Sequence, residues 1–180
     1  QAPGRRPILS LSPKWPIAAA EAKPQTVRTL SSYEHAPILE NALTSAARRL
    51  LIVSPWIRHQ VVNEEFLKKL SDCLERNVDV TIAFGFGRVD RGERAEDIEA
   101  RKALEALSLT FKKFKLIRKS NIHAKILLVD DRYFVTTSFN WLSFRGDPNQ
   151  PLREEEGTLV EGSELVNEYF ERLQSRLVAS

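Results

Sequence analysis

The sequence predicts an α/β sandwich in which a mixed central sheet is flanked by helices on both faces. Segments with helical spacing of apolar residues alternate with short, β-branched apolar runs along residues 31–180, a pattern typical of helices packed against a sheet. Two of the runs, Ile126–Val129 and Tyr133–Thr137, are separated only by Asp130, Asp131 and Arg132. Such a short polar connection predicts an antiparallel hairpin. The sheet is therefore expected to be mixed.

Residues 1–30 are interpreted as a proline-rich basic arm or linker, and residues 31–180 as the folded domain. Residues 1–27 contain five prolines and show no sustained hydrophobic period, which is typical of an extended segment. The apolar side chains of Ile8, Leu11 and Trp15 suggest that part of the arm packs on the domain or on a partner subunit. Because the chain begins with Gln1, we expect a processed product or a part of a larger protein.

The first half of the domain is expected to contain helices and buried strands in alternation. Ser32 and Asn63 are suited to cap helix N-termini, and apolar residues recur after each at helical spacing. The run Leu50–Val53 is apolar on both faces, as expected of a central strand covered by helices. The predicted elements are a helix from Ser32 to Arg49, the strand Leu50–Val53, a helix from Asn63 to Asn77, a strand Val78–Phe84 and a helix Glu93–Leu107.

The glycine-containing segment 85–92 is interpreted as a flexible loop near the mouth of a site. Glycines let backbone amides approach an anion, but the segment lacks the GK[ST] ending and the G-x-G-x-x-G spacing of phosphate loops. Its Arg88, together with Arg91 and Arg94, is expected to line a substrate channel.

The segment from Lys112 to Lys125 contains six basic residues and no acidic one. Two interpretations stay open, a strand with one solvated basic face or an approach path for a polyanion. The second is favoured slightly because the segment leads into a chemically distinctive motif. Basic side chains attract a nucleic-acid backbone regardless of its sequence. The predicted substrate-binding residues here are Lys112, Lys113, Lys115, Arg118 and Lys119.

After the hairpin, residues 141–153 are expected to form a polar loop that contains Gly146, Pro148 and Pro151. A strand Glu155–Val160 and a helix Ser163–Val178 are expected to complete the domain, because each carries apolar residues at the spacing of its element.

The stretch 121–140 carries the most specific motif of the chain, H-x-K-x4-D, formed by His123, Lys125 and Asp130. Side chains alternate along a strand, so His123 and Lys125 are expected to share one face. Asp130 has the opposite parity, and we expect it to fix the hairpin rather than to contact a substrate. Ser138 and Asn140 follow after the turn.

This motif resembles that of the phospholipase D superfamily, whose members usually continue with G-S-x-N and a glutamate shortly before a hydrophobic strand. The corresponding segments here are Thr137-Ser138-Phe139-Asn140 and Glu155-Glu156-Gly157. The resemblance extends from about His35 to the end of the chain. One departure is Thr137 where the family generally has glycine, since a β-branched residue disfavours positive φ and close backbone approach.

The resemblance implies a phospholipase-D-like fold and a catalytic set of His123, Lys125, Asp130, Ser138, Asn140 and Glu155. It implies His123 as a nucleophile that forms a phosphohistidine. Lys125 and Asn140, with Ser138, would stabilise the charged transition state. Glu155 would bond the histidine ring, with Glu154 and Glu156 as rivals. No metal or other cofactor is required.

The family chemistry uses two such motifs, and this chain has one. Single-motif members form a two-fold dimer, and an isologous interface lets one sequence supply both histidines. We therefore expect a homodimer with the shared site on its axis. A motif from another part of a parent protein could also complete the pair.

Composition excludes few other classes. No apolar run approaches the length that spans a bilayer, so no membrane partner is expected. A single cysteine, Cys73, permits no internal disulfide and predicts a reducing, cytoplasmic location. The net charge of +3 permits a polyanionic partner.

The leading functional hypothesis is a metal-independent phosphodiesterase, specifically an endonuclease that acts on DNA or RNA. A lipid phosphodiesterase is one alternative. The other is a non-catalytic nucleic-acid-binding or dimerisation module of a larger protein, such as a helicase or a defence complex.

Overall fold

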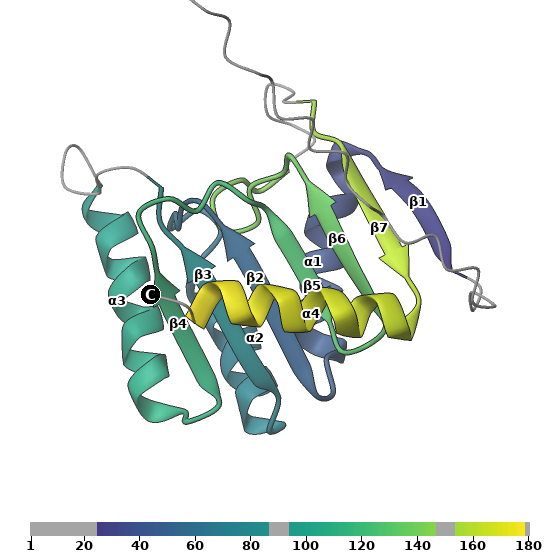
Figure 1. Cartoon of the computed structure of the whole chain (residues 1–180). Coiled ribbons are helices and arrows are strands. Elements are labelled where there is room, and N and C mark those ends of the chain that lie inside the picture. Colours follow the sequence, from purple (N-terminus) through teal and green to yellow (C-terminus); the bar gives the residue numbers. More distant parts are fainter. Residues whose placement is uncertain (1–24, 87–93, 147–153, 179–180) are drawn as a thin grey trace, which may run out of the picture.

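The computed structural model describes residues 25–86, 94–146 and 154–178, which form one mixed sheet of seven strands in the order β1-β7-β6-β5-β2-β3-β4 (Figure 1). The strands are β1 Thr26–Leu30, β2 Arg49–Ser54, β3 Asp79–Phe84, β4 Phe114–Arg118, β5 Ile126–Val129, β6 Tyr133–Thr137 and β7 Gly157–Glu161. The helices are the 3-10 turn η1 Ser32–Glu34, α1 His35–Ser45, α2 Glu64–Glu75, α3 Ala95–Thr110 and α4 Ser163–Val178.

The two halves of the sheet differ in strand direction. β2, β3 and β4 are parallel neighbours, with α2 and α3 in the connections between them. β5 lies antiparallel to β2 on the other side, and β6, β7 and β1 continue in alternating directions. The predicted hairpin is confirmed, because Ile126 pairs with Thr136 and Val129 with Tyr133.

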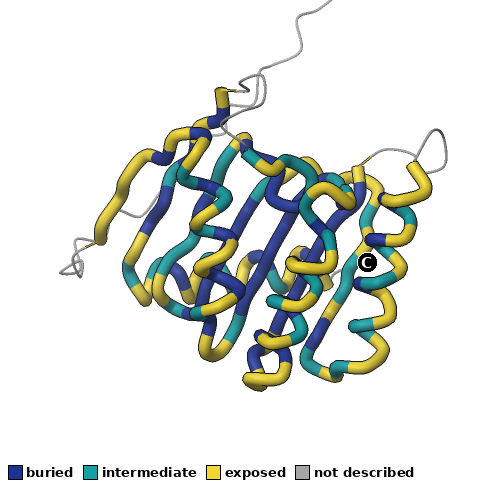
Figure 2. The backbone as a smooth tube through the Cα atoms, turned by 180° about the vertical axis from the view of Figure 1, so that it is seen from behind, coloured by how far each residue is buried: buried dark blue, intermediate teal, exposed yellow. Residues whose placement is uncertain are grey.

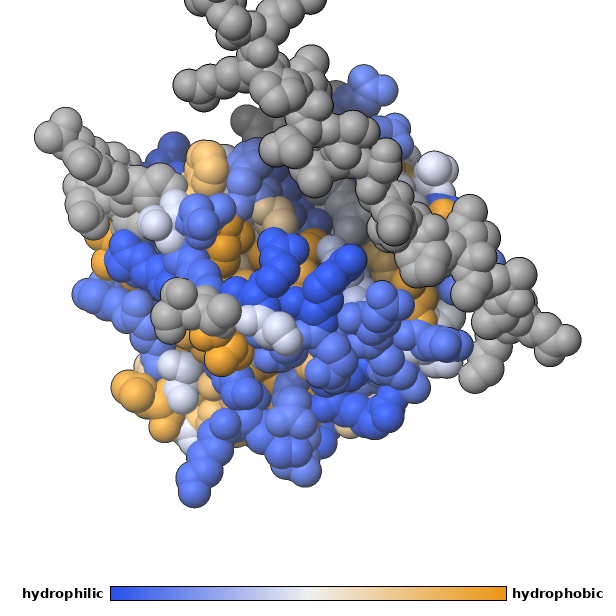
Figure 3. Space-filling model, viewed as in Figure 1, coloured by the Kyte–Doolittle hydropathy of each residue, from blue (hydrophilic) through white to orange (hydrophobic). Residues whose placement is uncertain are grey.

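Helices cover both faces of the sheet, as the sequence predicted. α1, α2 and α3 lie on one face and α4 crosses the other (Figures 1 and 2). In β2, Leu50 and Ile52 belong to the core beneath the first three helices, whereas Leu51 and Val53 pack with α4. The two-sided apolar run is thus buried on both sides. The outer surface on the α4 side is mostly hydrophilic (Figure 3).

Strand β1 is an addition to the predicted sheet. Thr26–Leu30 lies in the segment that was interpreted as an arm, yet all five residues pair with β7. Only Leu30 among them is buried, so the strand has none of the apolar alternation on which strand prediction depends. The prediction of an arm for residues 1–24 lies outside the described residues.

The first predicted helix differs from the observed one at both ends. The observed cap is Ser31, whose backbone N–H and hydroxyl donate to the Glu34 carboxylate at 2.8 and 2.9 Å. The predicted cap, Ser32, is instead a buried residue of η1. The helix ends at Ser45, because Arg49 already pairs with Asp79 in the sheet.

Helices α2 and α4 agree closely with the prediction, whereas α3 continues past the predicted end at Leu107 to Thr110. Asn63 accepts a hydrogen bond from the Phe66 N–H at the start of α2, and Asn77 ends the segment at φ 68°. The range of α4 is the predicted Ser163–Val178.

Candidate active site

The strand directions bring distant segments of the chain to one edge of the sheet. β2, β3, β4 and β6 end at this edge, while β5 and β7 begin there. The residues just before β5, just after β6 and just before β7 therefore meet, although they are far apart in sequence. These segments contain His123 and Lys125, Ser138 and Asn140, and Glu155.

His123 and Lys125 form the exposed centre of this edge. The Lys125 ammonium lies 3.3 Å from Nε2 of His123, so it can donate to the lone pair of a neutral imidazole. The imidazole is exposed, whereas Lys125 is half-buried. Burial lowers the pKa of Lys125, and the negative charge of Glu155 partly opposes this shift. The two side chains thus lie together as predicted, although both residues precede β5 and neither is in a strand.

Ser138 and Glu155 are joined directly. The Ser138 hydroxyl donates to the Glu155 carboxylate and accepts from the Glu156 N–H at 3.1 Å. Glu155 is buried, and its backbone N–H donates to the Ser32 hydroxyl at 2.7 Å. Among the described residues, the Glu155 carboxylate bonds Ser138 and not the His123 ring. The predicted contact between Glu155 and His123 is therefore absent from this arrangement of the single chain.

Asn140 is buried with an incomplete set of partners. Its Oδ1 atom has no hydrogen-bond partner among the described residues, and the same holds for Nε1 of the adjacent Trp141. A buried polar atom without a partner is costly, and such a position is typical of a group that binds a ligand or an ordered water.

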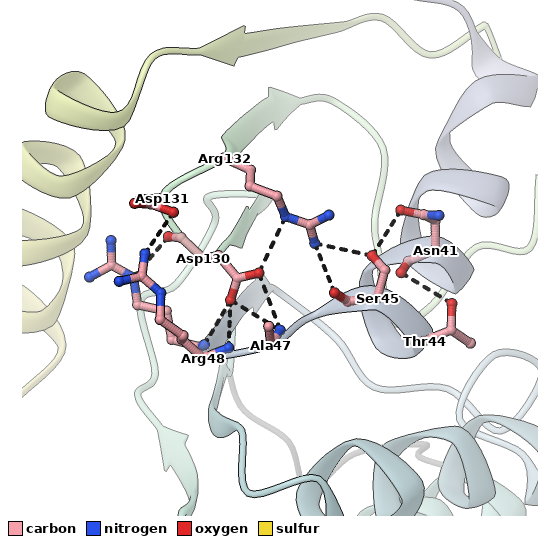
Figure 4. A network of polar contacts seen from close by, with 9 residues as sticks. Asn41, Thr44, Ser45, Ala47, Arg48, Asp130, Asp131 and Arg132 are labelled. Carbon is pink, nitrogen blue, oxygen red and sulfur yellow. Dashed lines mark hydrogen bonds and ion pairs between the residues drawn. The ribbon is translucent and has the colours of Figure 1, made fainter.

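Asp130 lies at the opposite edge of the sheet and is not part of the site. Its carboxylate accepts from the backbone N–H groups of Ala47, Arg48 and Arg49, the nearest at 2.8 Å, and pairs with Arg132 (Figure 4). Burial acts to raise the pKa of Asp130, but these donors outweigh it and hold the pKa below its ordinary value. The assignment of Asp130 to the catalytic set is thus wrong. Asp130 fixes the hairpin, as expected, but the reason is that it lies at the far end of β5 from His123.

The predicted basic approach is divided between the two edges. Arg118 ends β4 and Lys119 follows it. Both residues line an open groove of about 1030 Å³ that also includes His123 and Arg176. Lys113, by contrast, pairs with Asp79 at 3.6 Å at the start of β4. A strand advances about 3.3 Å per residue, so roughly 16 Å separates the two ends.

Lys112 and Lys115 are therefore not at the groove either. Lys112 precedes β4 at the opposite edge, and Lys115 pairs with Thr81 within the sheet. Of the predicted substrate-binding residues, the structure brings only Arg118 and Lys119 to the site. Arg88 lies outside the described residues.

A buried histidine that was not among the predicted site residues, His35, contacts the segments that carry the site. His35 is fully buried at the start of α1, and its ring stacks on Phe139 with centroids 4.7 Å apart. Its Nδ1 lies 2.9 Å from the Ser31 carbonyl oxygen, and its Nε2 lies 2.8 Å from the Thr137 hydroxyl. A Cβ atom at Gly157 would lie 2.6 Å from this ring, so glycine is needed there.

Thr137 is accommodated without backbone strain. It lies in β6, and among the described residues only Asn77 and Asp130 combine a side chain with positive φ. Its hydroxyl donates to the Glu156 carbonyl oxygen at 2.8 Å and accepts from the Phe139 N–H at 2.9 Å. The Thr137 hydroxyl thus ties the end of β6 to the segment that carries Glu155.

Two aromatic residues that lie beside His123 were also not among the predicted site residues. The Phe86 ring lies 4.7 Å from the His123 ring, measured between centroids, and Trp56 lies 6.4 Å from it. Both follow strands that end at this edge, a position that only the sheet order reveals.

Neither a metal cluster nor a membrane helix is found in the described part of the chain. No three His, Cys, Asp or Glu residues there are grouped so that they could hold a metal ion. No helix there is both long and apolar enough to cross a bilayer.

A family profile described as "Cardiolipin synthase, PLD-like domain" matches residues 39–176. No curated protein sequence matches the chain significantly. Among solved structures, the fold is similar to Nuc from Salmonella typhimurium, described as a phospholipase D family member. That match has a TM-score of 0.62 and 21% sequence identity, and covers 85% of this chain and 94% of Nuc.

Two further solved structures share the fold. NucT from Helicobacter pylori matches with a TM-score of 0.62 and 11% identity, over 84% of this chain and 95% of NucT. TrmBL2, an archaeal chromatin protein whose structure is described as showing a novel mode of DNA binding, matches with a TM-score of 0.55 and 11% identity. That match covers 83% of this chain and 51% of TrmBL2.

Proposed function

The chain belongs to the phospholipase D superfamily, and from this we propose that it is a metal-independent phosphodiesterase that cleaves DNA or RNA as an endonuclease. One observation carries the proposal. The Lys125 ammonium lies 3.3 Å from Nε2 of an exposed His123, at the mouth of a groove that Arg118 and Arg176 line. A neutral imidazole beside fixed cations is suited to attack an anionic phosphodiester.

The reaction would proceed in two displacements. In the first, Nε2 of His123 forms a bond to phosphorus and the bond to the leaving oxygen breaks, which produces a phosphohistidine. In the second, water attacks phosphorus, the P–N bond breaks and the imidazole is regenerated. A neutral nucleophile avoids the repulsion that phosphate oxygens exert on an anionic one.

Charge on the non-bridging oxygens would be stabilised by neighbours already in place. Lys125 is half-buried and cationic, so its charge acts at lower dielectric than in water. Asn140 would contribute through its buried amide, and Ser138 would contribute once its hydroxyl proton turns from the Glu155 carboxylate to a phosphate oxygen. Glu155, bonded to Ser138, would hold that hydroxyl in position and favour the cationic form of Lys125.

The leaving oxygen needs a proton, and a two-fold dimer would provide the donor. One chain contains one such motif, so the second histidine would come from an identical chain across the axis. In that arrangement Glu155 could also meet the ring that it does not contact within the single chain. In the same dimer, the groove of each subunit would contact one shared substrate molecule.

Two alternatives are each favoured by one finding. The description of the matching family profile names a cardiolipin synthase, which favours a lipid phosphodiesterase. TrmBL2, described as a chromatin protein, favours a DNA-binding module without catalysis. The basic groove beside His123 supports nucleic acid over lipid, because cations concentrate a polyanion.

A cleavage assay with and without chelator tests the proposal. Labelled single-stranded and double-stranded DNA and RNA are incubated with wild type and with His123→Ala. We expect chelator-resistant cleavage by wild type, and a loss of at least about 10³-fold in His123→Ala because the nucleophile is removed. Binding of the same substrates should persist.

His59→Ala is the matched control, since His59 is another exposed histidine, and it should cleave like wild type. Hydrolysis of phospholipid vesicles with nucleic acids intact would replace the proposal with the lipid alternative. Binding without cleavage by either protein would support the module.

A further inference from the structure

We infer that Phe86, backed by Trp56, is a stacking site for one unpaired nucleobase next to the phosphate attacked by His123. The substrate class is then single-stranded nucleic acid. This inference rests on the nucleic-acid activity proposed above and adds how the substrate is held and which form of it is selected.

The aromatic side chains form a continuous group around the candidate nucleophile. The Phe86 and Trp56 rings meet edge to face, with centroids 5.8 Å apart and planes at 88°. Phe86 also lies against the His123 ring at 4.7 Å. Trp56 is half-buried, whereas Phe86 is 43% exposed. A base stacked on Phe86 would therefore lie within one nucleotide of a phosphate at His123.

Backbone contacts fix Phe86 relative to His123. The Gly85 N–H donates to the Pro55 carbonyl at 3.0 Å, and the Ile122 N–H donates to the Gly85 carbonyl at 2.7 Å. Phe86 itself forms an isolated β-bridge with Asn121. The end of β3 is thus tied both to the segment after β2 and to the segment that carries His123.

Gly85 is required for this arrangement. Its φ is 119°, and a Cβ there would lie 2.2 Å from the Lys119 carbonyl oxygen. The close approach brings the end of β3 against the segment after β4. An exposed aromatic ring on such a fixed support loses little conformational entropy when a ligand stacks on it.

The charges beside the ring favour a nucleobase as the occupant. Arg118 and Arg176 line the groove that His123 shares, and aromatic rings next to a cationic groove are the combination that binds single strands. A choline head group would also bind an aromatic face, but these cations would repel it. In a duplex, paired bases stack on one another and are not free to reach the ring.

The test compares two ligands that differ only in their bases. Short oligothymidylate and a chain of abasic tetrahydrofuran phosphates of equal length are labelled with a fluorophore. Binding is measured by anisotropy, and cleavage is measured separately. We expect wild type to bind oligothymidylate about ten-fold more tightly, because stacking on an aromatic ring favours a base by that order. Phe86→Leu should bind both alike, whereas Phe86→Tyr should keep the preference.

The abasic ligand also serves as the internal control. If Phe86 only positions His123, Phe86→Leu lowers cleavage of both ligands equally, which overturns the inference. Equal binding of both ligands by wild type overturns it as well, as does conversion of a Phe86→Leu dimer to monomers. Leu109→Ala, an exposed apolar residue near the end of α3, should change nothing.

Failure of the proposed function gives a different result. If no ligand is cleaved but wild type prefers oligothymidylate and Phe86→Leu does not, catalysis is refuted and the stacking site stands. If cleavage occurs without base preference, catalysis stands and the stacking site is refuted.

Discussion

At the residue scale, the distance between Lys125 and His123 has the clearest chemical meaning. The Lys125 ammonium lies 3.3 Å from Nε2, the ring nitrogen proposed to attack phosphorus. The same cation is placed to meet charge that develops on a bound phosphate. The burial that lowers the pKa of Lys125 also makes its charge more effective.

Removal of this charge should reduce the rate more than the binding of substrate. For Lys125→Gln we expect kcat to fall by about 10²- to 10³-fold, as for other groups that stabilise transition-state charge, with a smaller change in KM. Steady-state cleavage kinetics measure both. Lys112→Ala, at the opposite edge of the sheet, should match wild type. A Lys125→Gln variant with unchanged kcat would contradict this role.

His35 supports the same site through its hydrogen bonds and through its stacking on Phe139. Its Nδ1 faces the carbonyl oxygens of Ser31 and Ser32, so Nδ1 carries a proton. In the neutral ring Nε2 is then an acceptor, and the single proton of the Thr137 hydroxyl is shared between Nε2 and the Glu156 carbonyl oxygen. Burial lowers the pKa of His35, although the carbonyls and the charges of Glu155 and Glu34 act in the opposite direction.

A pH dependence of stability follows from this pKa. The unfolded chain binds a proton near the ordinary value of 6.5, whereas folded His35 binds it only at lower pH. Its contribution is therefore complete above pH 6.5 and is lost as pH falls through the folded pKa. Urea unfolding of wild type should show this loss, and His35→Gln should show less of it. A rise in stability on acidification would contradict the assignment.

At the element scale, Asp130 joins the β5–β6 hairpin to the turn between α1 and β2. Three backbone N–H groups and the Arg132 side chain contact the Asp130 carboxylate (Figure 4). Asp130 itself has a positive φ of 55°. Such a cluster of donors is costly to leave without an acceptor.

Substitution of Asp130 should therefore affect stability and not chemistry. For Asp130→Ala we expect a loss of about 3 kcal/mol in the free energy of unfolding, because three backbone donors and Arg132 lose their common acceptor. Activity per folded molecule should be unchanged. The adjacent Asp131 forms a more exposed ion pair with Arg48, so Asp131→Asn should cost less than about 1 kcal/mol. Equal losses would contradict the assigned role.

Prediction from sequence succeeded for the elements that a short stretch of sequence is enough to specify. The two-sided apolar run of β2, the Asn63 cap and the hairpin are short-range signals, and all three are confirmed. β1 lacks such a signal because its residues are mostly exposed. The contact between His35 and Thr137 spans 102 residues, and no local pattern encodes it.

The site was predicted in part for the same reason. His123 and Lys125 lie together as predicted, but they lie just before β5, and the length of β5 rather than strand parity separates Asp130 from them. The basic segment looked continuous in sequence, but β4 carries its two ends to opposite edges of the sheet. Phe86 and Trp56 follow β3 and β2, and they lie near His123 only because of the order of the strands in the sheet.

At the scale of the whole molecule, the proposed dimer predicts how subunits combine. If each phosphate needs a histidine from both chains, a mixed dimer of wild type and His123→Ala is inactive. After subunit exchange at equal concentrations, random pairing should give about one quarter of the activity that wild type alone shows at the same total protein concentration. Independent subunits would leave about half, and that result would contradict the shared site.

The central claim is that the His123 imidazole becomes covalently bound to phosphorus. Rapid quenching of a cleavage reaction, followed by peptide mapping in a mass spectrometer at alkaline pH, tests it most directly. We predict an acid-labile nucleotide adduct on the peptide that contains His123, and its absence in His123→Ala. An adduct on another residue, or undiminished cleavage by His123→Ala without any adduct, would contradict the account.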